Sequence, residues 1–423
     1  MINRIILIGN GFDLAHGMKT SYRDFIDKYW NDKCEEYEKN EHYLFECEEF
    51  SINSKHNTYY ENTIRTFSDL DAFAKDYKRN FTSKNNFFIN LSRQLNYEGW
   101  VDIESAFYDN LKAMSILQRT EKSNMIDVLN KSFEGITRLI EKHLTDVQNS
   151  FKINSLINDR ITEIINQPIV TQDLSELVIR KIIDDNWQLL QSHIEEYNGT
   201  MKRGHYLTSN HQKIVKNFVR ENTHSRTKGH FTSYILRNFS ELFISEKPYT
   251  EFINFNYTST ESHYTTPETH ICHIHGELNS KENPIIFGYG DELDEHYKEI
   301  EKLNDNRYLD NVKSINYAKT GNYKKVLNMI NDGLFQVFIL GHSCGNSDRT
   351  LLNTIFEHEN CASIKVFYHQ KNETEDNFLD IYKNISRNFN SKAKLRDRVV
   401  NKFYSEPLIP FKLQQEINQI TEK

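Results

Sequence analysis

Glycine and proline are distributed unevenly along this chain, and their distribution restricts the fold more than any other feature. Gly9, Gly11 and Gly17 lie close together at the start, whereas few glycines follow before Cys272, and Pro168 is the only proline before Pro248. Beyond Pro248 both residue types become frequent again. Helix interiors tolerate these residues poorly, while loops between short strands use them. The chain is therefore expected to have a helical middle between two ends built from strands and loops.

The middle of the chain has the apolar periodicity of amphipathic helices. Between Met125 and Phe151 the apolar residues recur in steps of three and four, at Val128, Leu129, Phe133, Ile136, Leu139, Ile140, Leu144 and Val147. Similar spacing recurs from Leu156 to Ile165 and from Leu177 to Leu190. Such steps place apolar side chains on one helix face. We therefore predict a helical insertion domain over residues 46–245, and a second domain made of residues 1–45 and 246–423.

The two ends of the chain contain short apolar runs that predict buried strands. These runs are Ile5–Ile8, Phe252–Phe255, Ile285–Phe287, Val337–Leu340 and Ile364–Tyr368. Several lead directly into small or polar residues, which is typical of a parallel sheet whose carboxyl ends carry ligand-binding loops. The predicted fold class is therefore α/β, with a parallel sheet assembled from both ends of the chain and a large helical insertion.

Charge and cysteine content exclude some classes of protein. The chain has 60 acidic and 52 basic residues, a formal net charge of -8, which argues against general coating of nucleic acid but leaves a local basic groove open. No apolar run approaches the roughly 20 residues of a membrane span, and no signal peptide is recognised. The five cysteines form no CxxC pair, as in a cytoplasmic protein with reduced thiols. Because His270, Cys272, His273 and His275 lack a common zinc-ligand spacing, we predict no metal site.

The first candidate motif is the turn that follows the run Ile5–Ile8. Its residues are Gly9, Asn10, Gly11, Phe12 and Asp13. Glycines let the backbone approach a phosphate, and the start of a following helix offers unpaired N–H groups. Leu14 occupies the third glycine position of a full GxGxxG fingerprint. An ordinary strand-to-helix turn explains the motif about as well.

Two further motifs follow predicted strands. Asn256 ends one strand, and His275-Gly276 closes another, with His273 and His275 on one face of it. An imidazole exchanges protons near neutral pH, so His275 is a candidate general base, although it can equally bond a carbonyl group. Val337–Leu340 leads into Gly341, Ser343 and Asp348, whose small or hydrogen-bonding side chains suit ribose or phosphate oxygens. A plain Gly/Ser turn is the alternative there.

Taken in chain order, these motifs resemble those of two protein families. Gly9–Phe25 resembles the opening of the abortive-infection AbiH family and a divergent form of the sirtuin opening GAGxSxxSGIPxFR. The other similarities are Asn256 to the Asn of the sirtuin-like TNYD/QNID motif, His275-Gly276 to its catalytic HG, Gly341-His-Ser343 to its GxS, and Trp100–Glu104 to a WxDxE element of such defence proteins. The resemblance covers residues 1–25, 100–104 and 252–369.

This resemblance implies a Rossmann-like (sirtuin-like) domain in a phage-defence effector that hydrolyses NAD at the nicotinamide–ribose bond. In that reaction Asn256 would position water or a ribose hydroxyl and His275 would be the general base. Gly9, Gly11, Ser343 and Asp348 would hold phosphates and ribose. Asp13 stands where the sirtuin opening has Ser, and a carboxylate beside a pyrophosphate is electrostatically unfavourable. The sirtuin four-cysteine zinc module is missing, which argues against protein deacylation.

Two other functions stay open on the sequence. Arg138 and His143 fit the loose R-x4-H pattern of HEPN ribonucleases, although Leu139 occupies a position that is usually polar. Alternatively, the core binds a nucleotide without cleaving it and serves as a sensor. Beyond a nucleotide ligand, the expected partners are a second copy of the chain or a companion defence or phage protein.

Overall fold

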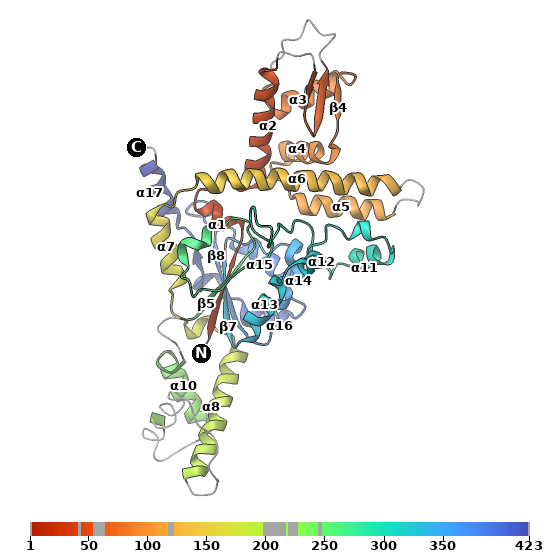
Figure 1. The fold of residues 1–423 in the computed structure, drawn as a ribbon. Helices are drawn as coiled ribbons and strands as arrows, with labels where there is room; N and C mark the ends of the chain where they lie inside the picture. Colours follow the sequence, from red (N-terminus) through yellow and green to blue (C-terminus); the bar gives the residue numbers. More distant parts are fainter. Residues whose placement is uncertain are drawn as a thin grey trace.

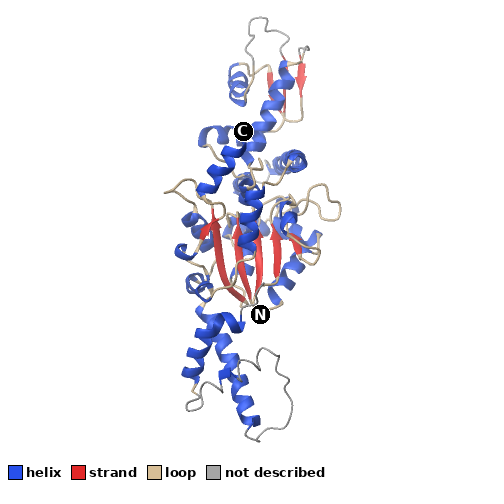
Figure 2. Ribbon diagram, turned by 90° about the vertical axis from the view of Figure 1, so that its left-hand side faces the viewer, coloured by secondary structure: helices blue, strands red, loops and turns tan. Residues whose placement is uncertain are grey.

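The computed structural model describes residues 2–40, 44–53, 64–116, 122–197, 217–218, 227–243 and 248–421. A six-stranded sheet forms its centre (Figures 1 and 2). The strands are β1 (Asn3–Ile8), β5 (Thr250–Asn254), β6 (Ile271–His273), β7 (Phe335–Leu340), β8 (Cys361–Tyr368) and β9 (Glu406–Pro407). Every neighbouring pair is parallel. The predicted α/β class and the parallel sheet built from both ends of the chain are thus confirmed.

The strand order places β1 in the middle of the sheet. The order is β6-β5-β1-β7-β8-β9, which becomes 3-2-1-4-5-6 when these strands are numbered along the chain. The chain therefore adds strands first on one side of β1 and then on the other. In open parallel sheets the crevice at such a reversal, outside the carboxyl ends of the strands, is where ligands bind.

One predicted strand is wrong. Ile285–Phe287 is extended chain outside the sheet, and the third strand on that side is β6 instead. Ile286 and Phe287 are buried, so the apolar run correctly indicated burial. However, Pro284 precedes the run and Gly288 follows it with a φ of 155°, and such residues interrupt a strand ladder. His275 likewise lies in the turn after β6 and does not belong to the strand.

Helices cover both faces of the sheet, so the core has three layers. On one face, side chains such as Ile5 and Leu7 pack against α13 (Asn322–Asn331), α14 (Arg349–Phe356), α15 (Phe378–Arg387) and α16 (Lys392–Arg398). On the other, Ile6 and Ile8 pack against α1 (Asn10–Ala15), α7 (Ser155–Ile165) and α17 (Phe411–Thr421). This alternation follows from the two-residue period of a strand buried on both sides.

A second unit lies over the carboxyl ends of the strands, with its own aromatic-rich core (Figure 1). Its helices are α2 (Tyr22–Glu38), α3 (Phe67–Asp76), α4 (Asn86–Glu98), α5 (Ile103–Ile116) and α6 (Lys122–Ser150). The predicted insertion range is not purely helical, because it contains β3 (Phe50–Asn53) and β4 (Phe81–Ser83), which form an antiparallel sheet with β2 (Leu44–Glu46) at its boundary. At the opposite end of the molecule project α8 (Glu176–Tyr197) and α10 (Lys228–Phe243). The domain boundary at 45/46 stays a prediction, and the one at 245/246 lies outside the described residues.

Two short helices, α11 (Glu295–Lys302) and α12 (Lys313–Asn316), connect the extended segment after β6 to α13. Across the described ranges, no helix is both long enough and apolar enough to span a membrane.

The turns after β1 and β7 touch backbone to backbone, and this contact explains their glycines. The Gly11 N–H donates to the Gly341 carbonyl at 2.8 Å. A Cβ on Gly341 would lie 2.0 Å from the Phe12 nitrogen, and Gly341 has a φ of 72°. A Cβ on Gly9 would lie 2.5 Å from the His342 Cα. Only glycine permits two backbones to approach this closely.

Gly341→Ala should therefore destabilise the protein more than a positive φ alone would. A left-handed backbone costs an alanine about 1–2 kcal/mol, and at Gly341 the clash with the backbone of Gly11 and Phe12 adds to this cost. Gly17→Ala is the matched control, because Gly17 has a φ of 80° but a Cβ added there would meet no atom within 4 Å. Urea unfolding of both variants checks this expectation, and equal losses would contradict it.

Candidate functional site

A cleft of about 370 Å³ lies at the carboxyl ends of β1, β5 and β7, where the strand order reverses. Nine of the ten predicted site residues line it: Gly9, Asn10, Gly11, Asp13, Asn256, His275, Gly341, Ser343 and Asp348. Phe12 does not line it. Its ring is buried against His16 and Tyr264 on the other side of the turn. Segments far apart in the sequence thus meet in one cavity.

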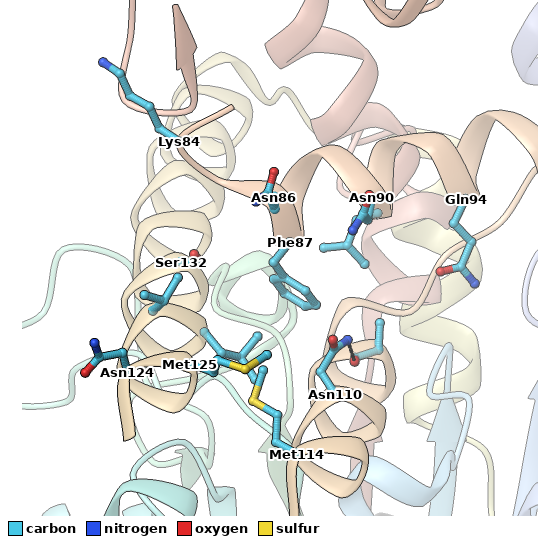
Figure 3. Close-up of a pocket in the computed structure, with 14 residues that line it drawn as sticks. Lys84, Asn86, Phe87, Asn90, Gln94, Asn110, Met114, Asn124, Met125 and Ser132 are labelled. Atoms are coloured by element: carbon cyan, nitrogen blue, oxygen red, sulfur yellow. Dashed lines mark hydrogen bonds between the residues drawn. The ribbon is translucent and has the colours of Figure 1, made fainter. Parts of the chain in front are cut away.

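A second cavity of about 360 Å³ lies within the insertion, among α4, α5 and α6 (Figure 3). Apolar side chains such as Phe87, Met114 and Met125 line it together with several asparagines, and Lys84 is the one charged residue among the described lining residues. None of the predicted site residues reaches it. Proton-transfer chemistry needs titratable groups, so the cleft at the strand ends is the candidate site.

The glycine turns in the cleft use their own N–H groups. Gly11 donates to Gly341, and Phe12 donates to the Gly9 carbonyl at 2.8 Å. The N–H groups of Gly11 and Phe12 are therefore already bonded within the turns. The glycines let the two turns pack together.

Asn256 is held at its backbone and at its side chain. The Asn254 side-chain oxygen accepts the Asn256 N–H at 2.8 Å, and the Asn256 amide nitrogen donates to the Gly9 carbonyl at 3.1 Å. Asn254 is itself anchored by the buried Glu261 at 2.6 Å. These bonds fix the plane of the Asn256 carboxamide within the cleft.

His275 has the protonation state that a general base requires. Its Nδ1 lies 3.0 Å from the Phe255 carbonyl oxygen. Because a carbonyl can only accept, Nδ1 carries a proton. Nε2 lies 3.3 Å from the Tyr317 hydroxyl and 3.2 Å from Asp348 Oδ1. Burial and the nearby Lys313 ammonium lower the pKa of His275, with Asp348 acting in the opposite direction. The ring is therefore neutral at physiological pH.

Lys313 is the functional residue that the sequence analysis missed. Its side chain is 2% exposed, and its Nζ lies 2.9 Å from Glu104 Oε2 and 2.9 Å from Asp348 Oδ1. Burial alone would lower the pKa of Lys313, but the two carboxylates raise it. Nothing in the stretch around Lys313 marks it as special. The sequence indicated only its partners, Asp348 in the loop after Val337–Leu340 and Glu104 in the Trp100–Glu104 element.

The two carboxyls that flank Lys313 have opposite pKa shifts. Burial raises the pKa of Glu104 to about 7, although Lys313 opposes this shift. Burial would also raise the pKa of Asp348, but Lys313 and His275 outweigh it and lower that pKa well below its usual range. Asp348 is therefore ionised next to the imidazole. His342 Nε2 lies 3.5 Å from its other oxygen.

Asp13 is a further buried carboxyl in the cleft. Burial raises its pKa to about 6, and the hydroxyl of Thr258, which donates a hydrogen bond to it, acts against that shift. Together with Asp102, Glu104 and Asp348, Asp13 gives the cleft an acidic lining. The ammonium of Lys313 is already paired with Glu104 and Asp348. Such a lining favours groups that carry or develop positive charge.

A second buried histidine, His273, does not share a face with His275 as the sequence predicted. His273 ends β6, and its Nε2 lies 2.9 Å from Glu261 Oε1. Burial would lower the pKa of His273, but Glu261 raises it. Glu261 bonds both His273 and Asn254. Because Asn254 in turn accepts the Asn256 N–H, the Glu261–His273 pair helps to fix the position of Asn256.

The insertion forms one side of the cleft. Trp100, Asp102 and Glu104 line it from the segment before α5 and the start of that helix, and His143 lines it from α6. His143 Nε2 lies 2.9 Å from the Lys19 carbonyl oxygen. Arg138, its partner in the R-x4-H pattern, is exposed and is not part of the lining. The cleft is thus completed by two parts of the molecule.

Comparison with known families confirms the AbiH part of the resemblance found in the sequence. Residues 5–370 match the family described as Bacteriophage abortive infection AbiH. The chain belongs to the AbiH family. Every residue that lines the cleft lies within the matched range. No curated protein and no solved structure matches the chain. The family connects this AbiH protein with abortive infection, a defence against bacteriophage.

Lys313→Met should destabilise this AbiH protein by about 3–5 kcal/mol, because it leaves Glu104 and Asp348 buried without their counter-charge. The control is Lys319→Met, which removes an exposed lysine from the same segment and should change stability by less than about 0.5 kcal/mol. The free energy of unfolding from urea titration distinguishes the two. A Lys313→Met variant as stable as the control would show that the buried ion pairs do not hold the cleft together.

Proposed function

We propose that this AbiH protein is an abortive-infection effector whose sheet is a Rossmann-like, sirtuin-like nucleotide-binding core, and that the cleft hydrolyses the nicotinamide–ribose bond of NAD. The observation that carries the proposal is the meeting of His275, Asn256 and Asp348 in one cleft with the two glycine turns. The strand order and the position of the cleft support it, because dinucleotides bind at this point of doubly wound sheets.

The acidic lining supports cleavage of this bond in particular. The C1′–N bond breaks with its electron pair going to the nicotinamide ring, which is positively charged in NAD and leaves neutral. No general acid is therefore needed, while the ribose develops oxocarbenium character. The carboxylates of Asp348 and Asp13 would stabilise that positive charge and attract the charged nicotinamide ring.

His275 would activate the attacking water. Its neutral Nε2 takes a proton from the water while the water oxygen forms the new bond to C1′. The resulting imidazolium is stabilised by Asp348, 3.2 Å away. The Asn256 nitrogen is held by Gly9, so its amide oxygen is oriented to accept a hydrogen bond from the water or from a ribose hydroxyl.

The ribonuclease alternative has less support. It needs Arg138 and His143 to act together, but only His143 lines the cleft, and its Nε2 is directed to the Lys19 carbonyl. The sensor alternative needs the same cleft without turnover, and ligand-induced melting shifts in the absence of hydrolysis would favour it.

Purified protein, together with any phage-derived activator it requires, should release nicotinamide and ADP-ribose from NAD. His275→Ala and Asn256→Ala should reduce the release at least about 100-fold, because they remove the base and the group that orients its water. His270→Ala is the matched control, since this exposed histidine lies outside the cleft. Chromatography of the products measures the release, and circular dichroism checks the fold.

The same variants separate the proposal from the ribonuclease alternative in cells. Toxicity under phage challenge should disappear in His275→Ala and persist in His143→Ala. If it persisted in His275→Ala and Asn256→Ala but disappeared in His143→Ala, NAD hydrolysis would be refuted as the cause of defence. Metabolite profiling of the infected cells should show loss of NAD in the wild type.

The pH dependence of hydrolysis should reflect the lowered pKa of His275. A base works only when unprotonated, so the midpoint of the fall in kcat/KM on the acid side should lie below pH 6.5, the usual pKa of histidine. Asp13 and Glu104 have pKa values of about 6 and about 7. The variants Asp13→Asn and Glu104→Gln therefore identify what each carboxyl contributes to the pH profile of kcat/KM. A midpoint at or above pH 6.5 in all three proteins would contradict the role of His275.

A further inference from the structure

We propose that Trp100 is a base-stacking subsite of the cleft that receives the adenine ring of the nucleotide. The choice of an adenine dinucleotide rests on the proposed function. The existence of a stacking surface rests on the placement of Trp100 itself.

Trp100 is unusually exposed for its residue type. Trp100 is 65% exposed, whereas Trp30, on α2, is 1% exposed and lies in the aromatic-rich core of the second unit. Tryptophan is on average strongly buried, because its exposed ring loses much apolar stabilisation. Among the described residues, no hydrogen bond or ring contact involves the Trp100 side chain. An indole left open at the rim of a cleft is available to a planar ligand.

The backbone around Trp100 is nevertheless held firmly. Gly99 ends α4 with a φ of 74°, and its carbonyl accepts a hydrogen bond from the Arg23 guanidinium at 2.7 Å. Val101 is buried in the core of the insertion. Asp102 caps α5 by accepting the N–H groups of Glu104 and Ser105, both at 3.1 Å. The indole therefore projects from a backbone fixed on both sides, so little ordering is needed when a ligand binds.

The rest of the cleft indicates which ring belongs at Trp100. The residues at the strand ends are acidic and include the proposed base, so they suit the charged nicotinamide riboside. The side formed by the insertion contains the acidic Asp102 and Glu104, and helices α2 and α6 add Phe25, Ile140 and Leu144, whose apolar side chains suit an uncharged ring. Adenine is planar and neutral, and stacking on an aromatic side chain does not require hydrogen-bonding partners.

Binding of AMP, ADP-ribose and nicotinamide mononucleotide to the full chain tests this assignment by calorimetry. Trp100→Ala should weaken AMP and ADP-ribose about 5- to 150-fold and leave nicotinamide mononucleotide unchanged, because that ligand lacks adenine. Trp100→Phe should retain part of the affinity. Tyr97→Ala is the matched control, since Tyr97 is 95% exposed nearby on α4 but does not line the cleft.

Tryptophan fluorescence gives a readout that does not depend on activity. AMP should quench the wild-type signal, and Trp100→Phe should abolish the quenching. The subsite is refuted if the wild type binds none of the adenine ligands, or if Trp100→Ala binds them as tightly as the wild type. Weaker AMP binding in Trp100→Ala without any NAD turnover in the wild type would retain the subsite and refute the hydrolysis. NAD turnover in the wild type, with an unchanged KM for NAD in Trp100→Ala, would support the hydrolysis and refute the subsite.

Discussion

The buried ammonium of Lys313 between Glu104 and Asp348 is the interaction on which the rest of the cleft depends. It connects the insertion, the segment before α13 and the turn after β7, which are distant in the sequence. Burial of a charge is costly unless the charge is paired, and each partner here would be destabilised alone. The same cation keeps Asp348 ionised and lowers the pKa of His275. One ionic cluster thus joins the two parts of the molecule and adjusts the candidate base.

This arrangement gives the insertion a chemical role as well as a structural one. Glu104 bonds Lys313, and Trp100 lines the same cleft, so a movement of α5 would change both the charge balance and the shape of the site. The match to the AbiH family covers the core and the insertion together. The cleft is therefore a property of the whole matched region, and the sheet alone does not complete it.

Several features could be predicted from the sequence because they depend on local patterns. Ile5–Ile8 is apolar on both faces, as a central parallel strand must be, and this pattern correctly predicted β1. The spacing of apolar residues in Met125–Phe151 correctly predicted α6. Ile285–Phe287 failed because burial and strand formation leave the same apolar pattern in so short a run. The small sheet β2–β4 was missed for a related reason, since its strands have only three or four residues each.

The sequence by itself determined the parallel core, the turns at its strand ends and nine of the residues that line the cleft, because a strand followed by glycine and polar residues is a local signal. Only the tertiary structure decided that Gly341 leaves no room for a side chain at Gly11, that the Gly11 and Phe12 N–H groups are already bonded, and that Lys313 belongs to the site. These facts depend on contacts between residues far apart in the chain. A lysine in a polar stretch looks the same whether it faces water or two buried carboxylates, and only packing distinguishes the two.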